Sequence, residues 1–194
     1  MQAVLRGFTQ GRLFRLVFPW VLRLVALLLL VFGVYVWIEV WIHISRPVGI
    51  ILATIFSQLL WIVALYALIH TLLIRASDIA RLPEGDYPAV STACILFRLI
   101  GELGAVISLF IGIVGCVAIW IAGADGTSLI AGLPLVPDIP ILTASGFLVG
   151  LQLLLMSIVQ ATLYVLGAYL VAELVMVTVA IFRNTRTIRE SMEK

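Results

Sequence analysis

Charged residues are scarce in this chain, at 11% of 194 residues, whereas soluble domains carry about 25%. Hydrophobic residues make up 63% of the sequence, so a water-soluble globule would lack the polar surface that it needs. The net charge of +2 is small and no basic stripe with interleaved aromatic residues occurs, which argues against a nucleic-acid partner. We therefore expect the lipid bilayer to be the main solvent of this protein.

Residues and motifs that carry catalysis are also missing. The chain has two cysteines and two histidines, and it contains no HExxH, CxxC, GxSxG, P-loop or GxGxxG pattern. The cysteines, Cys94 and Cys116, lie in one apolar segment, where a helix would separate them by about 33 Å and so prevent a disulfide between them. We expect no catalytic, cofactor-binding or metal-binding residues, no cofactor and no enzymatic activity.

Four apolar stretches are each long enough to cross a hydrocarbon core of roughly 30 Å, which takes about 20 helical residues. They cover residues 20–42, 48–70, 103–122 and 147–172. The helical pattern of the third begins at about residue 90 and that of the fourth continues to about residue 189, so both helices project beyond the membrane. The sequence predicts an all-α fold, an integral membrane four-helix bundle that forms a single transmembrane domain over residues 1–194.

Lysine and arginine gather on one side of the predicted membrane. Eleven of the twelve basic residues fall in the N-terminal segment, the loop between the second and third spans, and the C-terminal tail, and only Arg46 falls on the other side. Because basic loops resist translocation, we expect both termini to be cytoplasmic. The short connection at residues 43–47 predicts an antiparallel hairpin of the first two spans, and the last two form a second hairpin. The size of the chain suggests a bacterial inner membrane.

Ionisable residues inside a membrane are costly, and four of them lie at similar depth near the inner boundary. These residues are His70, Arg98, Glu102 and Glu173. Arg98 and Glu102 are four residues apart and can pair within their helix, while Glu173 could reach Arg98 from the neighbouring span. Two interpretations stay open: a polar latch that fixes the register of the helices, or a proton or cation site in which Glu102 or Glu173 titrates.

Polar side chains are few at the centres of the spans. They are Ser57 and Gln58 in the second span and Ser157 and Gln160 in the fourth. A hydrogen bond between Gln58 and Gln160 would set the register of the bundle more than its stability, because such bonds average about 0.6 kcal/mol in bilayers. The alternative is that these groups line a narrow pore.

Small residues repeat at offsets of four along one face of the third span. This face holds Gly101, Gly104, Ala105, Ser108, Gly112, Gly115 and Cys116. The fourth span offers a partial counterpart in Ala161, Ala168 and Ala172. Small side chains let membrane helices approach closely, so we expect either packing of spans three and four within one chain, or a contact with a second copy or another membrane subunit.

The C-terminal tail carries basic residues at a three-residue spacing. Arg183, Arg186 and Arg189 continue the fourth helix, and we expect them to reach anionic lipid headgroups. Because features of helix association are present and features of catalysis are missing, the sequence favours a non-enzymatic multi-pass membrane protein. We expect it to act as a structural or assembly subunit, in a homo-oligomer or with other membrane subunits. The alternative function is a small oligomeric ion channel or transporter.

Overall fold

The computed structural model describes residues 12–42, 48–82, 88–123 and 146–192. Within these ranges the chain forms four α-helices, each long and apolar enough to span a membrane. Over the described residues, the prediction of an all-helical fold with four helices long and apolar enough to span a membrane is therefore confirmed. Arg46 and the connection at residues 43–47, on which part of the predicted orientation depends, lie outside the described residues.

The helices are longer than the apolar runs that predict them. Helix α2 covers Arg12–Ile42, α3 covers Val48–Ala80, α4 covers Pro88–Ala122 and α6 covers Phe147–Met192. Helix α3 continues ten residues beyond the apolar span predicted over residues 48–70, and side chains of its last turns pack against α2 and α4. At about 1.5 Å per residue, the helices measure from about 47 Å to about 69 Å, well beyond a hydrocarbon core of roughly 30 Å.

Local chemistry accounts for the ends of α4 and the start of α6. Pro88 is the first residue of α4, where the missing N–H is not needed for a helical hydrogen bond. Gly123 follows the end of α4 with φ +59° and donates its N–H to the carbonyl of Ile119 at 2.9 Å, which is a typical glycine cap. The carbonyl of Gly146 accepts the N–H of Val149 at 3.2 Å as α6 begins.

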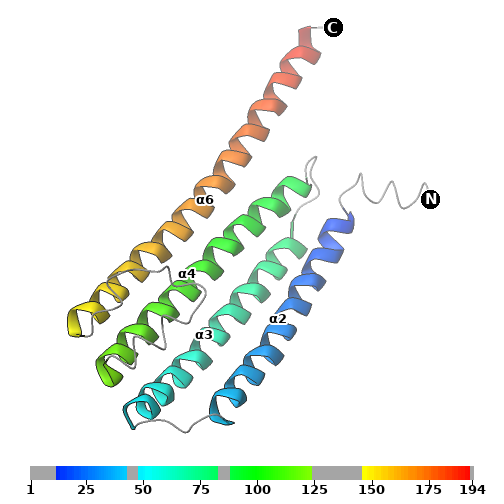
Figure 1. The fold of residues 1–194 in the computed structure, drawn as a ribbon. Coiled ribbons are helices and arrows are strands. Elements are labelled where there is room, and N and C mark those ends of the chain that lie inside the picture. The colour runs from blue at the N-terminus through cyan, green and yellow to red at the C-terminus, as the bar shows by residue number, and fades with distance from the viewer. Residues whose placement is uncertain (1–11, 43–47, 83–87, 124–145, 193–194) are drawn as a thin grey trace.

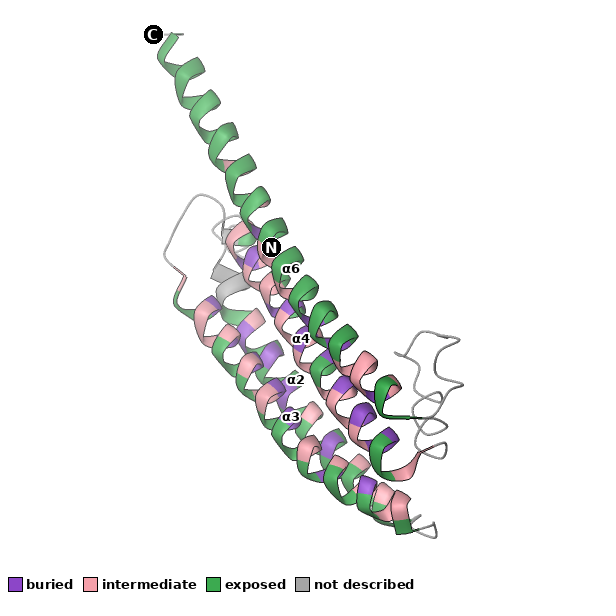
Figure 2. Ribbon diagram, turned by 90° about the vertical axis from the view of Figure 1, so that its left-hand side faces the viewer, coloured by how far each residue is buried: buried purple, intermediate pink, exposed green. Residues whose placement is uncertain are grey.

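The four helices lie side by side in the order of the chain (Figure 1). Helix α3 packs against α2 on one side and α4 on the other, and α4 packs most extensively against α6. Helices α2 and α6 therefore form the two edges of the layer. Helix α6 continues past the end of the other three as an exposed rod (Figure 2).

Buried residues are concentrated where neighbouring helices meet. One cluster joins α2, α3 and α4 and consists of Leu22, Ala26, Leu72, Ala76, Ile79 and Leu99. A second joins α3 and α4, with two residues of α6 against it, and has Ala53, Ala118 and Ile119 at its centre. The outward faces are mostly exposed leucine, isoleucine, valine and aromatic side chains, as expected of helices whose solvent is lipid.

Candidate functional site

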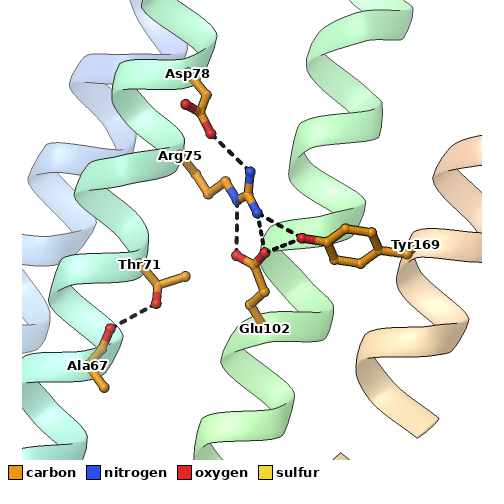
Figure 3. Close-up of polar contacts among 6 residues, drawn as sticks. All are labelled: Ala67, Thr71, Arg75, Asp78, Glu102 and Tyr169. Atoms are coloured by element: carbon orange, nitrogen blue, oxygen red, sulfur yellow. Dashed lines mark hydrogen bonds and ion pairs between the residues drawn. The ribbon is translucent and has the colours of Figure 1, made fainter. Parts of the chain in front are cut away.

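An arginine and a glutamate join α3 to α4 near one end of the layer. Arg75 on α3 donates from Nε to Oε2 of Glu102 on α4 at 2.9 Å, and from Nη2 to Oε1 of the same carboxylate (Figure 3). The planar guanidinium thus matches both oxygens of the carboxylate in a bidentate ion pair. The two side chains are only 17% and 21% exposed, so water screens the pair incompletely.

Tyr169 extends this ion pair to a third helix. Its hydroxyl donates to Oε1 of Glu102 at 2.8 Å and accepts a hydrogen bond from Nη2 of Arg75 at 3.1 Å. Nη1 of Arg75 also donates to Asp78, one turn later on α3, at 2.9 Å. We call Arg75, Asp78, Glu102 and Tyr169 the charged cluster, and the end of the layer that holds it the charged end. The cluster links α3, α4 and α6 at one level (Figure 3).

Arg98 contacts this cluster through an aromatic ring. Its guanidinium carbon lies 5.1 Å from the centroid of the Tyr169 ring, within the range of a cation–π interaction. The Nε atom of Arg98 is buried and has no hydrogen-bond partner among the residues of the four described segments. The sequence offered Arg98 as the partner of Glu102, whereas in the structure Arg75 forms the ion pair with that carboxylate.

The two other residues of the predicted latch are exposed and are not hydrogen-bond partners of the charged cluster. His70 is exposed on α3, and its ring stacks on Tyr66 with a centroid distance of 5.6 Å. Glu173 is exposed on α6, one turn beyond Tyr169. Of the four residues that sequence depth grouped together, Glu102 and Arg98 therefore meet at Tyr169, and His70 and Glu173 are not among the hydrogen-bond partners in the cluster.

The polar residues at the centres of the spans do not form one network. Ser57 donates to the carbonyl of Ala53 at 2.7 Å, and Ser157 donates to the carbonyl of Leu154 at 2.8 Å, each within its own helix. Gln160 is exposed and directs its amide nitrogen to the hydroxyl of Tyr164 at 3.5 Å.

Gln58 is the exception among these central residues, because it is buried. Its Oε1 has no hydrogen-bond partner among the described residues. The expected bond from Gln58 to Gln160 would have satisfied that oxygen. In the structure, the Gln160 amide instead contacts Tyr164 on its own helix, and the buried Gln58 oxygen has no hydrogen-bond partner among the described residues.

The glycines of α4 are the places where α6 comes closest. A Cβ atom added at Gly112 would lie 1.8 Å from Oγ and 2.3 Å from Cβ of Ser157. A Cβ atom at Gly101 would lie 2.3 Å from Cβ of Ala168, and one at Gly104 would lie 3.0 Å from the Tyr164 ring. The distances at Gly112 and Gly101 are shorter than van der Waals contacts allow, so α6 can approach α4 this closely there because both residues are glycine. At Gly104 the contact is tight, and the Tyr164 ring would have to move by a few tenths of an ångström.

The remaining small residues of the predicted packing face are also in the interior. Buried members on α4 are Ala105, Ser108, Gly115 and Cys116, and those on α6 are Ala161 and Ala172. The thiol of Cys94 lies 3.4 Å from the carbonyl of Ala172. The structure thus brings the small-residue faces of α4 and α6 together within one chain.

Several residues that position the helices were not singled out in the sequence. Arg75, Asp78 and Tyr169 complete the charged cluster. In the sequence, Arg75 is only one of the eleven basic residues that are predicted to lie on the cytoplasmic side. Gly33 on α2 is another, because an added Cβ would lie 2.6 Å from Leu65 of α3 and its carbonyl accepts from Trp61 Nε1 at 3.0 Å. A lone glycine in a long apolar helix signals such a close approach.

The basic residues of the tail lie on the part of α6 that projects from the layer. Arg183, Arg186 and Arg189 are all exposed. Arg186 forms an ion pair with Glu190 at 2.7 Å, one turn later on the same helix. Their predicted contact with lipid headgroups stays a prediction.

Metal ligands do not converge in the part of the chain that the structure describes, where no group of three or more His, Cys, Asp or Glu side chains could hold an ion. Comparison of the chain with protein-family models, with curated proteins and with solved structures gives no match. Three features of the chain itself bear on its function. They are the charged cluster, the close contact of α4 with α6, and the length of α6.

Proposed function

We propose that this protein is a non-enzymatic subunit of a membrane complex or homo-oligomer, anchored by four spans. The observation that carries the proposal is the length of α6 relative to the membrane. Its apolar part runs from Phe147 to Phe182, which is about 54 Å of helix, against roughly 30 Å of hydrocarbon. Lipid alone cannot cover this length, so another protein surface is needed beside α6.

The packing inside the chain supports the same function. Helix α4 and the charged cluster hold one face of α6 by close packing and a hydrogen bond, while most side chains around the rest of α6 are exposed. A partner that docks on a helix held in this way loses little conformational entropy on binding. Among membrane proteins, such a helix suits assembly better than it suits catalysis, for which convergent reactive groups would be required.

The proposed orientation places the charged end at the cytoplasm. Both termini are cytoplasmic, the helices form two antiparallel hairpins, and the membrane is a bacterial inner membrane. The support is the location of eleven of the twelve basic residues in segments assigned to that side. A fluorescent protein fused after Lys194 should fold and fluoresce in the cytoplasm, whereas an alkaline phosphatase fusion there should be inactive. An active phosphatase would reverse the proposed orientation.

The assembly proposal is tested by the composition of particles taken directly from native membranes. The tagged full-length chain should be extracted with a membrane-solubilising polymer and weighed by native mass spectrometry. We expect particles that contain two or more copies, or one copy with a second kind of chain. Particles that hold a single chain at native expression levels would overturn the proposal.

A small channel or transporter is the second candidate, and one observation favours it. Gln58 is buried near the centre of α3, and its carbonyl oxygen has no hydrogen-bond partner within the four described segments. A carbonyl oxygen is the kind of group that a permeating ion or water molecule needs. Replacing Gln58 by leucine separates the two candidates.

If the protein is an assembly subunit, we expect Gln58→Leu to leave the free energy of unfolding unchanged or to raise it by about 1 kcal/mol. The reason is that leucine replaces a buried polar group whose oxygen has no partner among the described residues. If the protein is a channel, we expect the same variant to abolish ion flux in proteoliposomes while the protein stays folded. Gln160→Leu is the matched control, since Gln160 is exposed on α6. Flux that is present in the wild type and absent only in Gln58→Leu would favour the channel.

A further inference from the structure

Helix α6 has two opposed apolar faces, and only one of them is covered. The face on α4 includes the buried residues Ala161 and Ala172. Leu163 follows Ala161 by two residues, and Leu174 follows Ala172 by two. A step of two residues is a rotation of about 200° about the helix axis, so both leucines lie on the opposite side of α6. We call this opposite stripe the outer seam. Its members are 56–64% exposed and are Leu163, Leu166, Leu170, Leu174, Val177, Ile181 and Ile188.

The spacing of the outer seam is that of a helix that packs on another helix. From Leu170 the steps are four, three and four residues to Ile181, and then seven to Ile188. Alternating steps of three and four give a period of 3.5 residues, which is typical of a coiled coil. Asn184 fills the position between Ile181 and Ile188. A lone polar residue on such a seam disfavours shifted registers, because a shift would set it against an apolar side chain.

A span of α6 that begins at Phe147 ends before the second half of the outer seam. A helix that enters the hydrocarbon at Phe147 has crossed roughly 30 Å after about 20 residues when upright, and after about 26 residues at a tilt of about 40°. The latter limit falls at Glu173. Leu174, Val177 and Ile181 therefore lie outside the hydrocarbon even at the upper end of observed tilts. Exposed apolar side chains in that position need a protein cover.

We infer that the outer seam of α6 pairs with the outer seam of a second copy of this chain, as a parallel two-stranded coiled coil. This inference rests on the proposed assembly function and names the partner. All copies insert in the membrane with the same orientation, so their α6 helices project on the same side and run parallel. A two-fold axis along the membrane normal then places each seam residue beside its own counterpart, which makes the seam self-complementary.

The area of the seam fits a pair that forms within a membrane. The four seam residues beyond Glu173 bury roughly 60–120 Å² each when covered, so two copies bury on the order of 500–1,000 Å². Stable complexes in solution bury about 1,200 Å² or more. The extension by itself is therefore too small for a stable soluble dimer. Confinement of both copies to one membrane, together with seam residues inside the bilayer, raises the effective concentration and makes up the difference.

Disulfide crosslinking in native membranes tests this pairing. Val177→Cys places a thiol on the seam, and Met176→Cys places one next to it on the same helix turn, at a similar exposure of 47% against 56%. The native Cys94 and Cys116 are buried, so the unmodified chain serves as the background. Under mild oxidation we expect a dimer band for Val177→Cys that is about five-fold or more stronger than for Met176→Cys.

The outcomes separate this inference from the proposed function. Equal crosslinking of the two variants, or no crosslinking of either, would overturn the pairing through the outer seam. If native particles still contain several chains in that case, the proposed assembly function stands without this pairing. A crosslinked band whose mass is not that of two copies would show a different partner and overturn the pairing. Single-chain native particles would overturn both proposals.

A second variant guards against failure of the cysteine chemistry. Ile181→Asp puts a charge on the seam, and Phe182→Asp, at a neighbouring exposed position off the seam, is its control. We expect the first to abolish dimers in nanodiscs and the second to retain them, with the thermal midpoint of each monomer unchanged. Dimers that persist in Ile181→Asp would contradict the pairing.

Discussion

Replacing Gly112 by alanine is expected to lower the free energy of unfolding by about 1–3 kcal/mol, the usual cost of overpacking a filled interior. The added methyl group would lie 1.8 Å from Oγ of Ser157, so either Ser157 or the whole of α6 must move. Alanine is the better helix former, and intrinsic helix propensity alone would therefore predict the opposite sign. The measurement is the thermal midpoint of the purified chain in one detergent.

Two further variants make the Gly112 result specific. Gly167→Ala is the matched control, because a Cβ at Gly167 on α6 would meet nothing within 4 Å, and it should leave stability unchanged or raise it. Adding Ser157→Gly to Gly112→Ala removes the obstructing side chain; the next atom is then the carbonyl oxygen of Leu153 at an ordinary 3.6 Å. This double variant should recover most of the lost stability. If it does not, the close contact of α4 with α6 is not the cause.

Removal of one partner from the charged cluster should also lower the free energy of unfolding strongly. Arg75→Leu leaves Glu102 with the Tyr169 hydroxyl as its remaining partner in the cluster. Loss of one member of a fully buried pair costs about 3–5 kcal/mol, and we expect about 2 kcal/mol here because each side chain is roughly a fifth exposed. Chemical or thermal unfolding of the variant in micelles measures this loss.

The double variant Arg75→Leu with Glu102→Leu tests the reason for that loss. It removes both charges, so no unpaired carboxylate is left at the interface of α3 and α4, and it should be more stable than Arg75→Leu. Arg186→Leu is the surface control, because the Arg186 and Glu190 side chains are 74% and 59% exposed, and it should change stability by less than about 0.5 kcal/mol. A double variant as unstable as the single one would argue against charge pairing as the main contribution of the cluster.

The number and character of the helices could be predicted from the sequence because both depend on composition alone. Runs of about 20 apolar residues have few structural options in lipid, where every backbone polar group must be satisfied within its own segment. The small-residue stripe of α4 was visible for a similar reason, since it stands out against larger neighbours. Its contact with Ser157 was not visible, because a stripe on one helix does not say which residue of a neighbour fills it.

The charged cluster could be predicted only in part. Depth along each span predicts that Glu102 and Arg98 lie near one level. In the structure, Arg75 on α3 and Arg98 on α4 both contact residues of the charged cluster. The choice between them depends on how α3 and α4 rotate about their own axes. A helix surrounded by lipid is apolar on its outer face as well as its inner one, so the periodicity that reveals rotation in soluble helices is weak here. For the same reason Gln58 and Gln160, which have similar depth, do not meet.

The order of the helices in the layer carries a consequence for biogenesis. Because α2 contacts α3, α3 contacts α4 and α4 contacts α6, each helix after α2 leaves the ribosome with one of its neighbours already made. Contacts between successive segments form quickly and need no rearrangement of earlier ones. Helix α6 is the last of the four helices to dock. Its outer seam takes up its position only after α6 has packed against the glycines of α4. Nascent chains would then remain single until α6 has docked on α4, and pairing would select for chains in which this contact has formed.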